Sequence, residues 1–112
     1  MRFLLLALAS LTTLQALLEI EEISAKNTGF PKAELQKLEI SCRLNYANAK
    51  SKIADYDIAI IQAKEVLKIE ENKKAYFRLG HAYFNLKKWE RAVLNLKKAL
   101  TFDSSKTDPI SN

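Results

Sequence analysis

The sequence predicts an all-α protein made of helical hairpins stacked as a short α-solenoid. Three observations support this fold class. The 112 residues include only two Gly and two Pro, and 48% of them are hydrophobic, which suits continuous helices rather than disorder or a β-rich fold. Apolar residues recur at helical spacing in two stretches, each broken by a short polar turn. The second stretch also repeats the first at a fixed interval, which indicates a repeat architecture.

The later hairpin carries the clearest pattern. Its first helix is predicted to place four residues on one face: Tyr76, Leu79, Gly80 and Tyr83. Its second helix has an apolar stripe: Trp89, Ala92, Val93, Leu96, Ala99 and Leu100. The small residues Gly80 and Ala92 are expected to let the two helices approach closely. This order of aromatic, Leu, Gly, Tyr, Ala and a large apolar residue resembles the tetratricopeptide repeat, with Ser104 in the place of the usual Pro.

An earlier hairpin is in register with the later one. A helical pattern runs from Ala33 to Ile53 and, after a break at Ala54–Asp55, resumes from Tyr56 to Ile69. Subtracting 33 pairs Ala92 with Ala59, Trp89 with Tyr56, Leu100 with Leu67, and Gly80 with Ala47. The usual period is about 34 residues, and the turn after residue 69 is the simplest place for the missing one. We therefore predict two repeats, about 33–72 and 73–106, and a polar tail at 107–112.

Residues 1–23 form an apolar N-terminal segment with two open interpretations. Arg2 followed by the apolar run Phe3–Leu18 is typical of a signal peptide, which would place the protein in the secretory pathway. The acidic and regular stretch Leu17–Ile23 instead favours a helix remaining from a degenerate first repeat. Residues 24–32 include Asn, Gly and Pro and are predicted to form a loop.

Each first helix carries a polar stripe opposite its apolar face. In the later repeat the stripe is Lys74, Arg78, His81 and Asn85. Subtracting 33 gives Ser41, Asn45, Asn48 and Lys52, which are also polar. First helices of such repeats line a concave groove, so the paired stripes suit an extended acidic peptide whose carboxylates accept hydrogen bonds from amides and cations. The same pattern also suits a solvated helix face.

Two stretches resemble one known family. Leu38–Lys50, with Asp55–Tyr56 and Ala59 after it, is similar to the second tetratricopeptide repeat of FKBP-type immunophilin co-chaperones. Lys73–Gly80 is similar to the start of their third repeat, and the loop at 24–32 resembles their connection between the first two repeats. The resemblance implies a groove that acts as a carboxylate clamp and grips the acidic C-terminal tail of heat-shock chaperones of the seventy and ninety kilodalton classes.

The resemblance also implies specific binding residues. Asn45 matches the clamp Asn of the second repeat, and Lys74 and Arg78 match the clamp Lys and Arg of the third. The Lys and Asn that the family's first repeat contributes have no match, so we expect a partial clamp with weak affinity. Asn48 and His81, from the same polar stripes, complete the set of candidate peptide-binding residues.

The family's peptidyl-prolyl isomerase domain has no match, which predicts a non-catalytic module. An isomerase and a secreted helical protein remain the alternatives. His81 is the single histidine and Cys42 the single cysteine, so no metal site, cofactor or internal disulfide is expected. The net charge of +5 comes from lysines spread along the helices, which indicates solvated faces, and no nucleic-acid-binding motif is present.

We therefore expect a cytoplasmic protein whose partner is a chaperone tail rather than nucleic acid or a membrane. The outer face of the last helix, with Val93, Leu96 and Leu100, is expected to remain partly exposed. An uncovered face at the end of a repeat stack predicts self-association or marginal stability.

Overall fold

The computed structural model describes residues 2–26, 29 and 31–102, with side chains from residue 11 onward. Its helices are α1 (Arg2–Lys26), α2 (Lys32–Lys52), α3 (Tyr56–Ile69), α4 (Lys73–Asn85) and α5 (Trp89–Thr101). No strand occurs in these ranges, and the predicted all-α class is confirmed. Helix α1 continues to Lys26, three residues into the range predicted as a loop. The predicted tail at 107–112, together with Ser104, lies outside the described residues.

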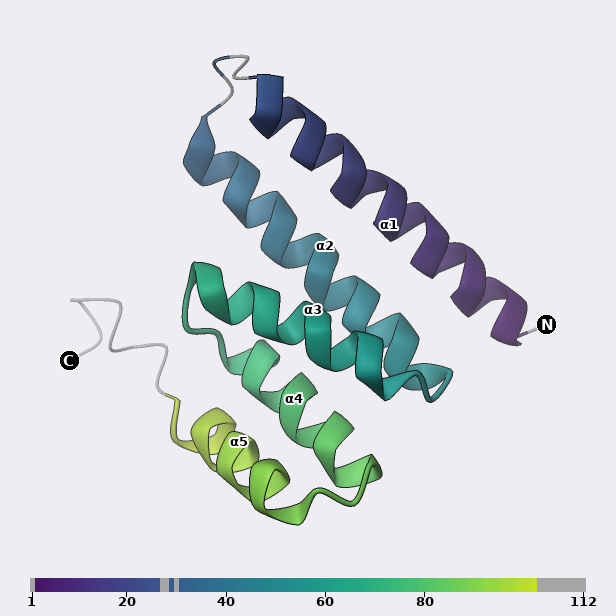
Figure 1. Cartoon of the computed structure of the whole chain (residues 1–112), viewed down its shortest axis with the longest axis vertical. Helices are drawn as coiled ribbons and strands as arrows, with labels where there is room; N and C mark the ends of the chain where they lie inside the picture. The colour runs from purple at the N-terminus through teal and green to yellow at the C-terminus, as the bar shows by residue number, and fades with distance from the viewer. Residues whose placement is uncertain (1, 27–28, 30, 103–112) are drawn as a thin grey trace.

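Each helix packs against the next one along the chain, which gives a stack with α1 at one end and α5 at the other (Figure 1). The hairpins α2–α3 and α4–α5 are those predicted from the sequence. Their first helices, α2 and α4, are also in contact with each other. Among the described helices, none is both long and apolar enough to cross a bilayer.

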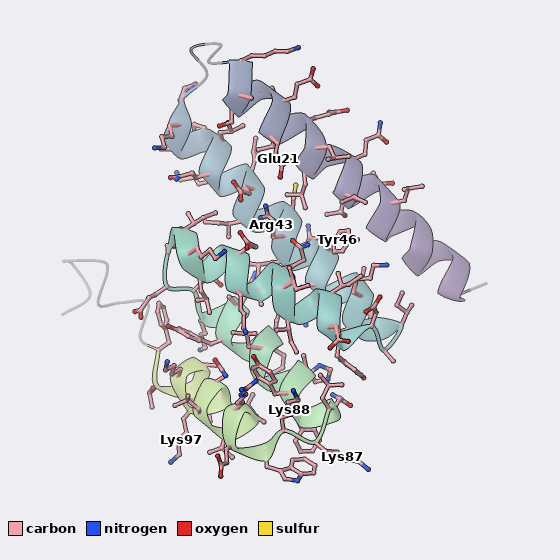
Figure 2. All side chains as sticks on the ribbon, in the orientation of Figure 1. Glu21, Arg43, Tyr46, Lys87, Lys88 and Lys97 are labelled. Atoms are coloured by element: carbon pink, nitrogen blue, oxygen red, sulfur yellow. The ribbon has the colours of Figure 1, made fainter. Side chains whose placement is uncertain are left out.

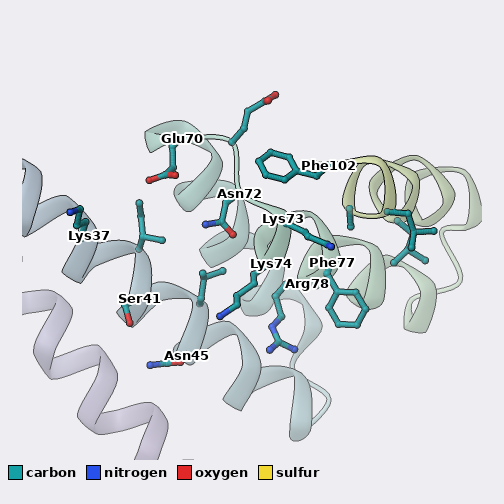
Figure 3. A pocket seen from close by; sticks show the side chains of 16 residues that line it. Lys37, Ser41, Asn45, Glu70, Asn72, Lys73, Lys74, Phe77, Arg78 and Phe102 are labelled. Carbon is teal, nitrogen blue, oxygen red and sulfur yellow. The ribbon is translucent and has the colours of Figure 1, made fainter. Parts of the chain in front are cut away.

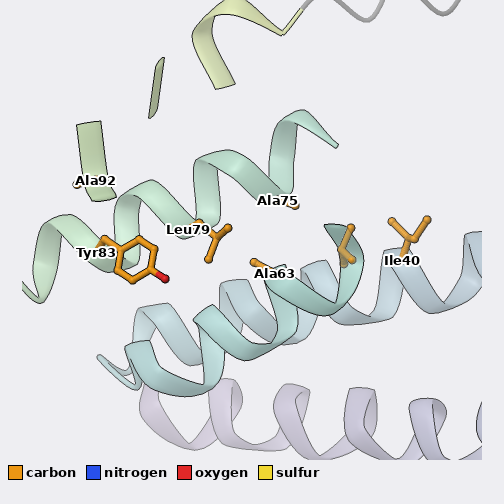
Figure 4. Packing of buried hydrophobic residues seen from close by; sticks show 7 residues of the cluster. Ile40, Ala63, Ala75, Leu79, Tyr83 and Ala92 are labelled. Carbon is orange, nitrogen blue, oxygen red and sulfur yellow. The ribbon is translucent and has the colours of Figure 1, made fainter. Parts of the chain in front are cut away.

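The hydrophobic core lies where the two hairpins meet (Figure 4). Its buried members are Ile40, Ala63, Val66, Ala75, Leu79, Tyr83 and Ala92. Helices α4 and α5 approach each other closely at Gly80. A Cβ atom built on Gly80 would lie 2.5 Å from Cγ of Leu96, so the absence of a side chain allows the contact between α4 and α5. The close approach expected at Gly80 is thus confirmed.

Both hairpins turn in the same way. The residue after the helix cap is Ala54 in one turn and Lys87 in the other, and both are left-handed, with φ of 64° and 62°. The next amide donates to a carbonyl five residues earlier, from Asp55 to Lys50 at 2.8 Å and from Lys88 to Tyr83 at 2.9 Å. These are Schellman motifs, which satisfy carbonyl groups at a helix end. The 33-residue repeat is therefore present in the backbone as well as in the side chains.

Arg43 ties three helices together (Figure 2). Its guanidinium donates to Glu39 on α2 at 2.9 Å and to Gln62 on α3 at 2.7 Å. A third guanidinium atom lies 4.0 Å from a carboxylate oxygen of Glu21 on α1. The side chain is only 13% exposed, so these contacts are partly shielded from water. Arg43 thereby links α2 to both α1 and α3.

Candidate functional site

A groove of about 990 Å³ is lined by α2, the turn between α3 and α4, α4 itself and the end of α5 (Figure 3). Its polar lining consists of Lys37, Ser41, Asn45, Glu70, Glu71, Asn72, Lys73, Lys74 and Arg78. Its apolar lining consists of Ile40, Leu44, Phe77, Leu96, Ala99, Leu100 and Phe102. Four cations and two carboxylates therefore line one groove, which gives it a net positive charge.

Three of the five candidate residues line this groove together. Lys74 and Arg78 project from successive turns of α4, and Asn45 lies across from them on α2 (Figure 3). Asn45 and Arg78 hold equivalent places in the two repeats, and the helices that carry them, α2 and α4, are in contact. The first turn of α4 is fixed by a cap, since the side-chain oxygen of Asn72 accepts from the amide of Ala75 at 3.0 Å.

The electrostatics of the site depend on Arg78. Its side chain is half-buried, and no carboxylate among the described residues forms an ion pair with it. The guanidinium carbon lies 5.8 Å from the ring centroid of Phe77, in a cation–π contact. Burial lowers the pKa of Arg78 from its ordinary value, yet an arginine keeps its proton at neutral pH. A partly desolvated cation without a counterion favours an anionic ligand.

The two carboxylates of the groove belong to the turn between α3 and α4. Figure 3 shows Glu70 well apart from Arg78. Glu71 is already engaged, because the hydroxyl of Tyr76 donates to its Oε1 at 3.1 Å. Burial raises the pKa of Tyr76, and the neighbouring Glu71 carboxylate raises it further. The anionic groups thus lie at one edge of the groove, and Lys74 and Arg78 lie on the side of Asn45.

The other two candidates do not line the groove. Asn48 is half-buried on α2, three residues after Asn45. His81 stacks on Phe77 with ring centroids 6.2 Å apart. Its backbone carbonyl accepts from Asn85 at 2.8 Å, and the Asn85 amide nitrogen lies 3.3 Å from its Nε2. Both candidates therefore lie one turn beyond the groove along their helices.

Several groove residues were missed by reasoning from the sequence. Lys37 stands four residues before Ser41, so extending the polar stripe by one turn would have found it. Phe77 stands between two stripe residues and is 47% exposed, and the sequence pattern gave it no role. Phe102 and Leu100 reach the groove from the end of α5, and no local pattern predicts a contact at that sequence separation.

The groove offers hydrogen-bond donors, positive charge and apolar surface. Among the residues the structure describes, no group of three or more His, Cys, Asp and Glu side chains could hold a metal ion. Cys42 is free and half-buried, and burial raises the pKa of its thiol, which disfavours the reactive thiolate. The arrangement therefore suits recognition of a chain with a carboxylate and apolar side chains.

Comparisons with known proteins support the repeat. Residues 74–106 match the family model described as Tetratricopeptide repeat. A relative, the small glutamine-rich tetratricopeptide repeat-containing protein 2 of Mycosarcoma maydis, is 42% identical over 62 residues, which is 54% of this chain. The match covers only 18% of that relative's length. No solved structure matches the chain significantly. The chain thus contains a tetratricopeptide repeat, while the finer likeness to FKBP-type co-chaperones is not established by these matches.

Proposed function

Because the chain contains a tetratricopeptide repeat, we propose that it is a non-catalytic protein-interaction module that binds an acidic C-terminal peptide in the groove between α2 and α4. Arg78 carries this proposal, since it is half-buried and has no counterion among the described residues. Lys74 lies one turn before it. Two cations at this spacing repel each other, and a carboxylate between them replaces the repulsion with charge-assisted hydrogen bonds.

A free C-terminus suits this donor set better than an internal acidic residue. A terminal Asp or Glu presents two carboxylates separated by a few bonds. Arg78 offers a planar fork of donors for one of them, and Lys74 offers a mobile ammonium group for the other. Asn45 supplies a neutral amide donor from the opposite wall of the groove. Amidation of the peptide terminus removes one of the two charges and leaves the rest of the peptide unchanged.

The resemblance to FKBP-type co-chaperones extends the proposal to a partner class, the acidic tails of heat-shock chaperones. Since these chaperones have cytoplasmic members, the proposal includes a cytoplasmic location. Asn45, Lys74 and Arg78 are three of the five clamp positions that the resembled family uses. The two missing positions belong to the family's first repeat. We therefore expect weaker binding than a complete clamp gives.

The test is a calorimetric titration with two peptides that end in Asp and differ only in a free or amidated C-terminus. The free acid is expected to bind more tightly. Arg78→Ala should weaken its binding by about tenfold or more, because a hydrogen bond to a charged group contributes roughly 1.5–3 kcal/mol. Arg78→Lys should recover only part of the loss, since the ammonium group lacks the bidentate fork.

Lys97→Ala is the matched control. Lys97 is exposed on α5 and does not line the groove, and its replacement changes the net charge by the same amount as Arg78→Ala. It should alter binding only through a small, salt-screened effect. Equal binding of the two peptides, or equal losses from the two variants, would show that the polar stripe is a solvated surface and would overturn the proposal.

A further inference from the structure

Exposed residues at the α5 end of the stack have covered equivalents in the earlier hairpin. We define the α5-end face by its five exposed members: Phe77 (47%), Phe84 (55%), Trp89 (55%), Val93 (52%) and Leu100 (82%). Subtracting 33 gives Leu44, Ser51, Tyr56, Ile60 and Leu67, all of which are buried or half-buried. At four of the five positions the repeat places an apolar or aromatic residue twice, with Ser51 as the exception, and only the first set is covered.

The helix that covers the first set is α4. Leu44, Ile60 and Leu67 pack against the core cluster, which includes three side chains of α4: Ala75, Leu79 and Tyr83. No helix among the described residues covers α4 and α5 in the same way. The α5-end face therefore fits a helix in the place that α4 would hold in a further repeat. Leu96 was expected to belong to this exposed face, but it is half-buried against Gly80.

Helix α1 carries the matching pattern on its outward side. Leu17 and Ile20 are buried, whereas a second set is exposed: Leu11 (62%), Leu14 (38%) and Leu18 (58%). The exposed set, here called the α1 outer stripe, has spacings of three and four residues. On α4 the buried Tyr76, Leu79 and Tyr83 have the same two spacings. The α1 outer stripe can therefore offer an apolar face of the kind that α4 presents to α3.

The charges of the two ends are opposite. Between residues 19 and 26, α1 carries three glutamates and one lysine. Residues 87–98 belong to the connection between α4 and α5 and to most of α5, and they include five basic residues and one glutamate. Figure 2 shows Lys87 and Lys97 at this end and Glu21 on α1. Charge complementarity of this kind orients an encounter between the two ends and disfavours contact between two identical ends.

From the uncovered face, the matched stripe and the opposite charges, we propose that a second copy of this chain docks its α1 outer stripe on the α5-end face. The contact is heterologous, because two different surfaces meet, and each added copy presents both surfaces again. The chain therefore associates head to tail, in open chains or closed rings. The α5-end face overlaps the groove at Phe77 and Leu100, whereas Trp89 and Val93 do not line the groove and can be changed without altering its lining.

Sedimentation equilibrium of the chain over a range of concentrations tests the proposal. The wild-type chain should show a mass that rises beyond the dimer with concentration. Leu11→Glu with Leu18→Glu removes one surface, and Trp89→Glu with Val93→Glu removes the other. Each double variant should remain monomeric at concentrations where the wild type associates. All four positions are exposed, and circular dichroism should show unchanged helix content.

Mixing the two variants separates this model from a symmetric dimer. One variant retains the α5-end face and the other retains the α1 outer stripe, so the equimolar mixture should form a one-to-one heterodimer that does not grow further. The pair Leu38→Glu with Ile61→Glu is the control, because both residues are exposed and lie on neither surface. It should associate like the wild type. A monomeric wild type, a mixture that stays monomeric, or equal loss in the control would overturn the proposal.

Discussion

The two hairpins have the same backbone conformation at their turns but are packed against different numbers of neighbouring helices. Hairpin α2–α3 lies between α1 and α4, whereas α4–α5 is covered on one side only by described helices. Both end their first helix in the same Schellman motif. Their interiors are filled differently. The earlier hairpin has alanines at 47 and 63, both fully buried, where the later one has Gly80 and Leu96.

This difference shows what the repeat specifies. The period sets where helices start, turn and touch, while total volume at a contact can be divided in more than one way between the partners. Equivalent positions can also carry different interactions, as residues 43 and 76 show. Arg43 binds three helices together in the enclosed hairpin, and its equivalent, Tyr76, forms one hydrogen bond to Glu71 in the hairpin at the end of the stack.

The largest difference between the hairpins is expected at Arg43. Arg43→Ala removes hydrogen bonds to Glu39 and Gln62 and leaves a carboxylate that is 27% exposed without its cation. We expect a loss of about 2–3 kcal/mol in the free energy of unfolding, measured in urea, because hydrogen bonds to charged groups contribute about 1.5–3 kcal/mol each and one partner remains partly solvated.

The control for Arg43 is an exposed ion pair on the same helix. Lys37 lies 4.0 Å from Glu34, and both side chains are mostly exposed. Lys37→Ala should therefore change stability by less than about 0.5 kcal/mol. If Arg43→Ala were as mild as Lys37→Ala, the three-helix contact would contribute nothing to stability, and the distinction between an enclosed and an end hairpin would lose its main support.

The next effect concerns the close approach at Gly80. Gly80→Ala gains about 1 kcal/mol of helix propensity, but its Cβ would lie 2.5 Å from Cγ of Leu96 and 3.1 Å from the Leu96 amide nitrogen. Overpacking of this severity costs up to about 3 kcal/mol, so we expect a net loss of about 1–2 kcal/mol in a thermal melt.

A double variant checks the cause of that loss. Gly80→Ala combined with Leu96→Ala reproduces the pair of alanines found at 47 and 63, so its cost should be clearly smaller than the sum of the two single costs. Additive costs would mean that Gly80 and Leu96 do not share one contact. In the earlier hairpin, Ala47→Gly should cost only the helix-propensity difference, about 1 kcal/mol, plus a small loss of packing.

A smaller and nearly equal effect is expected at the two turns. Ala54 and Lys87 both adopt positive φ, which costs an ordinary residue about 1–2 kcal/mol. Glycine relieves this strain, but its greater conformational freedom in the unfolded chain offsets part of the gain. Ala54→Gly and Lys87→Gly should therefore each raise the free energy of unfolding by about 0.5–1 kcal/mol. Denaturant midpoints would measure both. A gain at one turn and a loss at the other would break the equivalence of the two Schellman motifs.

Most of the fold could be predicted from the sequence because the spacing of apolar residues within each helix and the 33-residue interval between the hairpins can both be counted along the chain. The small residue Gly80 correctly marked a close contact between α4 and α5. The groove was only partly predictable. Lys74 and Arg78 share one helix, so their spacing places them together, and Asn45 followed from the repeat interval.

The remaining features depend on contacts between distant elements. Phe102 reaches the groove because α5 folds back along α4. The helical periodicity within one helix does not predict a contact between residues so far apart in the sequence. Trp89 belongs to the apolar stripe predicted for the second helix, yet it is 55% exposed and makes a T-shaped ring contact with Phe84, with ring centroids 5.4 Å apart. Whether such a residue is covered depends on the next helix in the stack, which a pattern within one repeat does not reveal.

The smallest effect is expected at Tyr76, and it appears only at alkaline pH. Burial and the Glu71 carboxylate raise the pKa of this phenol in the folded chain, whereas an unfolded tyrosine ionises near pH ~10. Below pH ~10 the phenol is protonated in both states, so its contribution to stability is constant. Above that pH the unfolded chain loses the proton first, and the free energy of unfolding falls as pH rises towards the folded pKa.

Tyr76→Phe isolates this contribution. At neutral pH the variant should lose about 0.5 kcal/mol, because its hydrogen bond to the exposed Glu71 is weak and partly replaced by water. Lysines titrate in the same alkaline range, but they are common to both proteins, so the difference between them reports the phenol alone. Urea unfolding at several pH values should show the wild type losing its advantage above pH ~10. The earlier hairpin has Arg43, and not a phenol, at the equivalent position. If the stability of the wild type and of Tyr76→Phe changed in parallel with pH, the pKa of Tyr76 would be the same in the folded and unfolded chains, which would contradict the prediction.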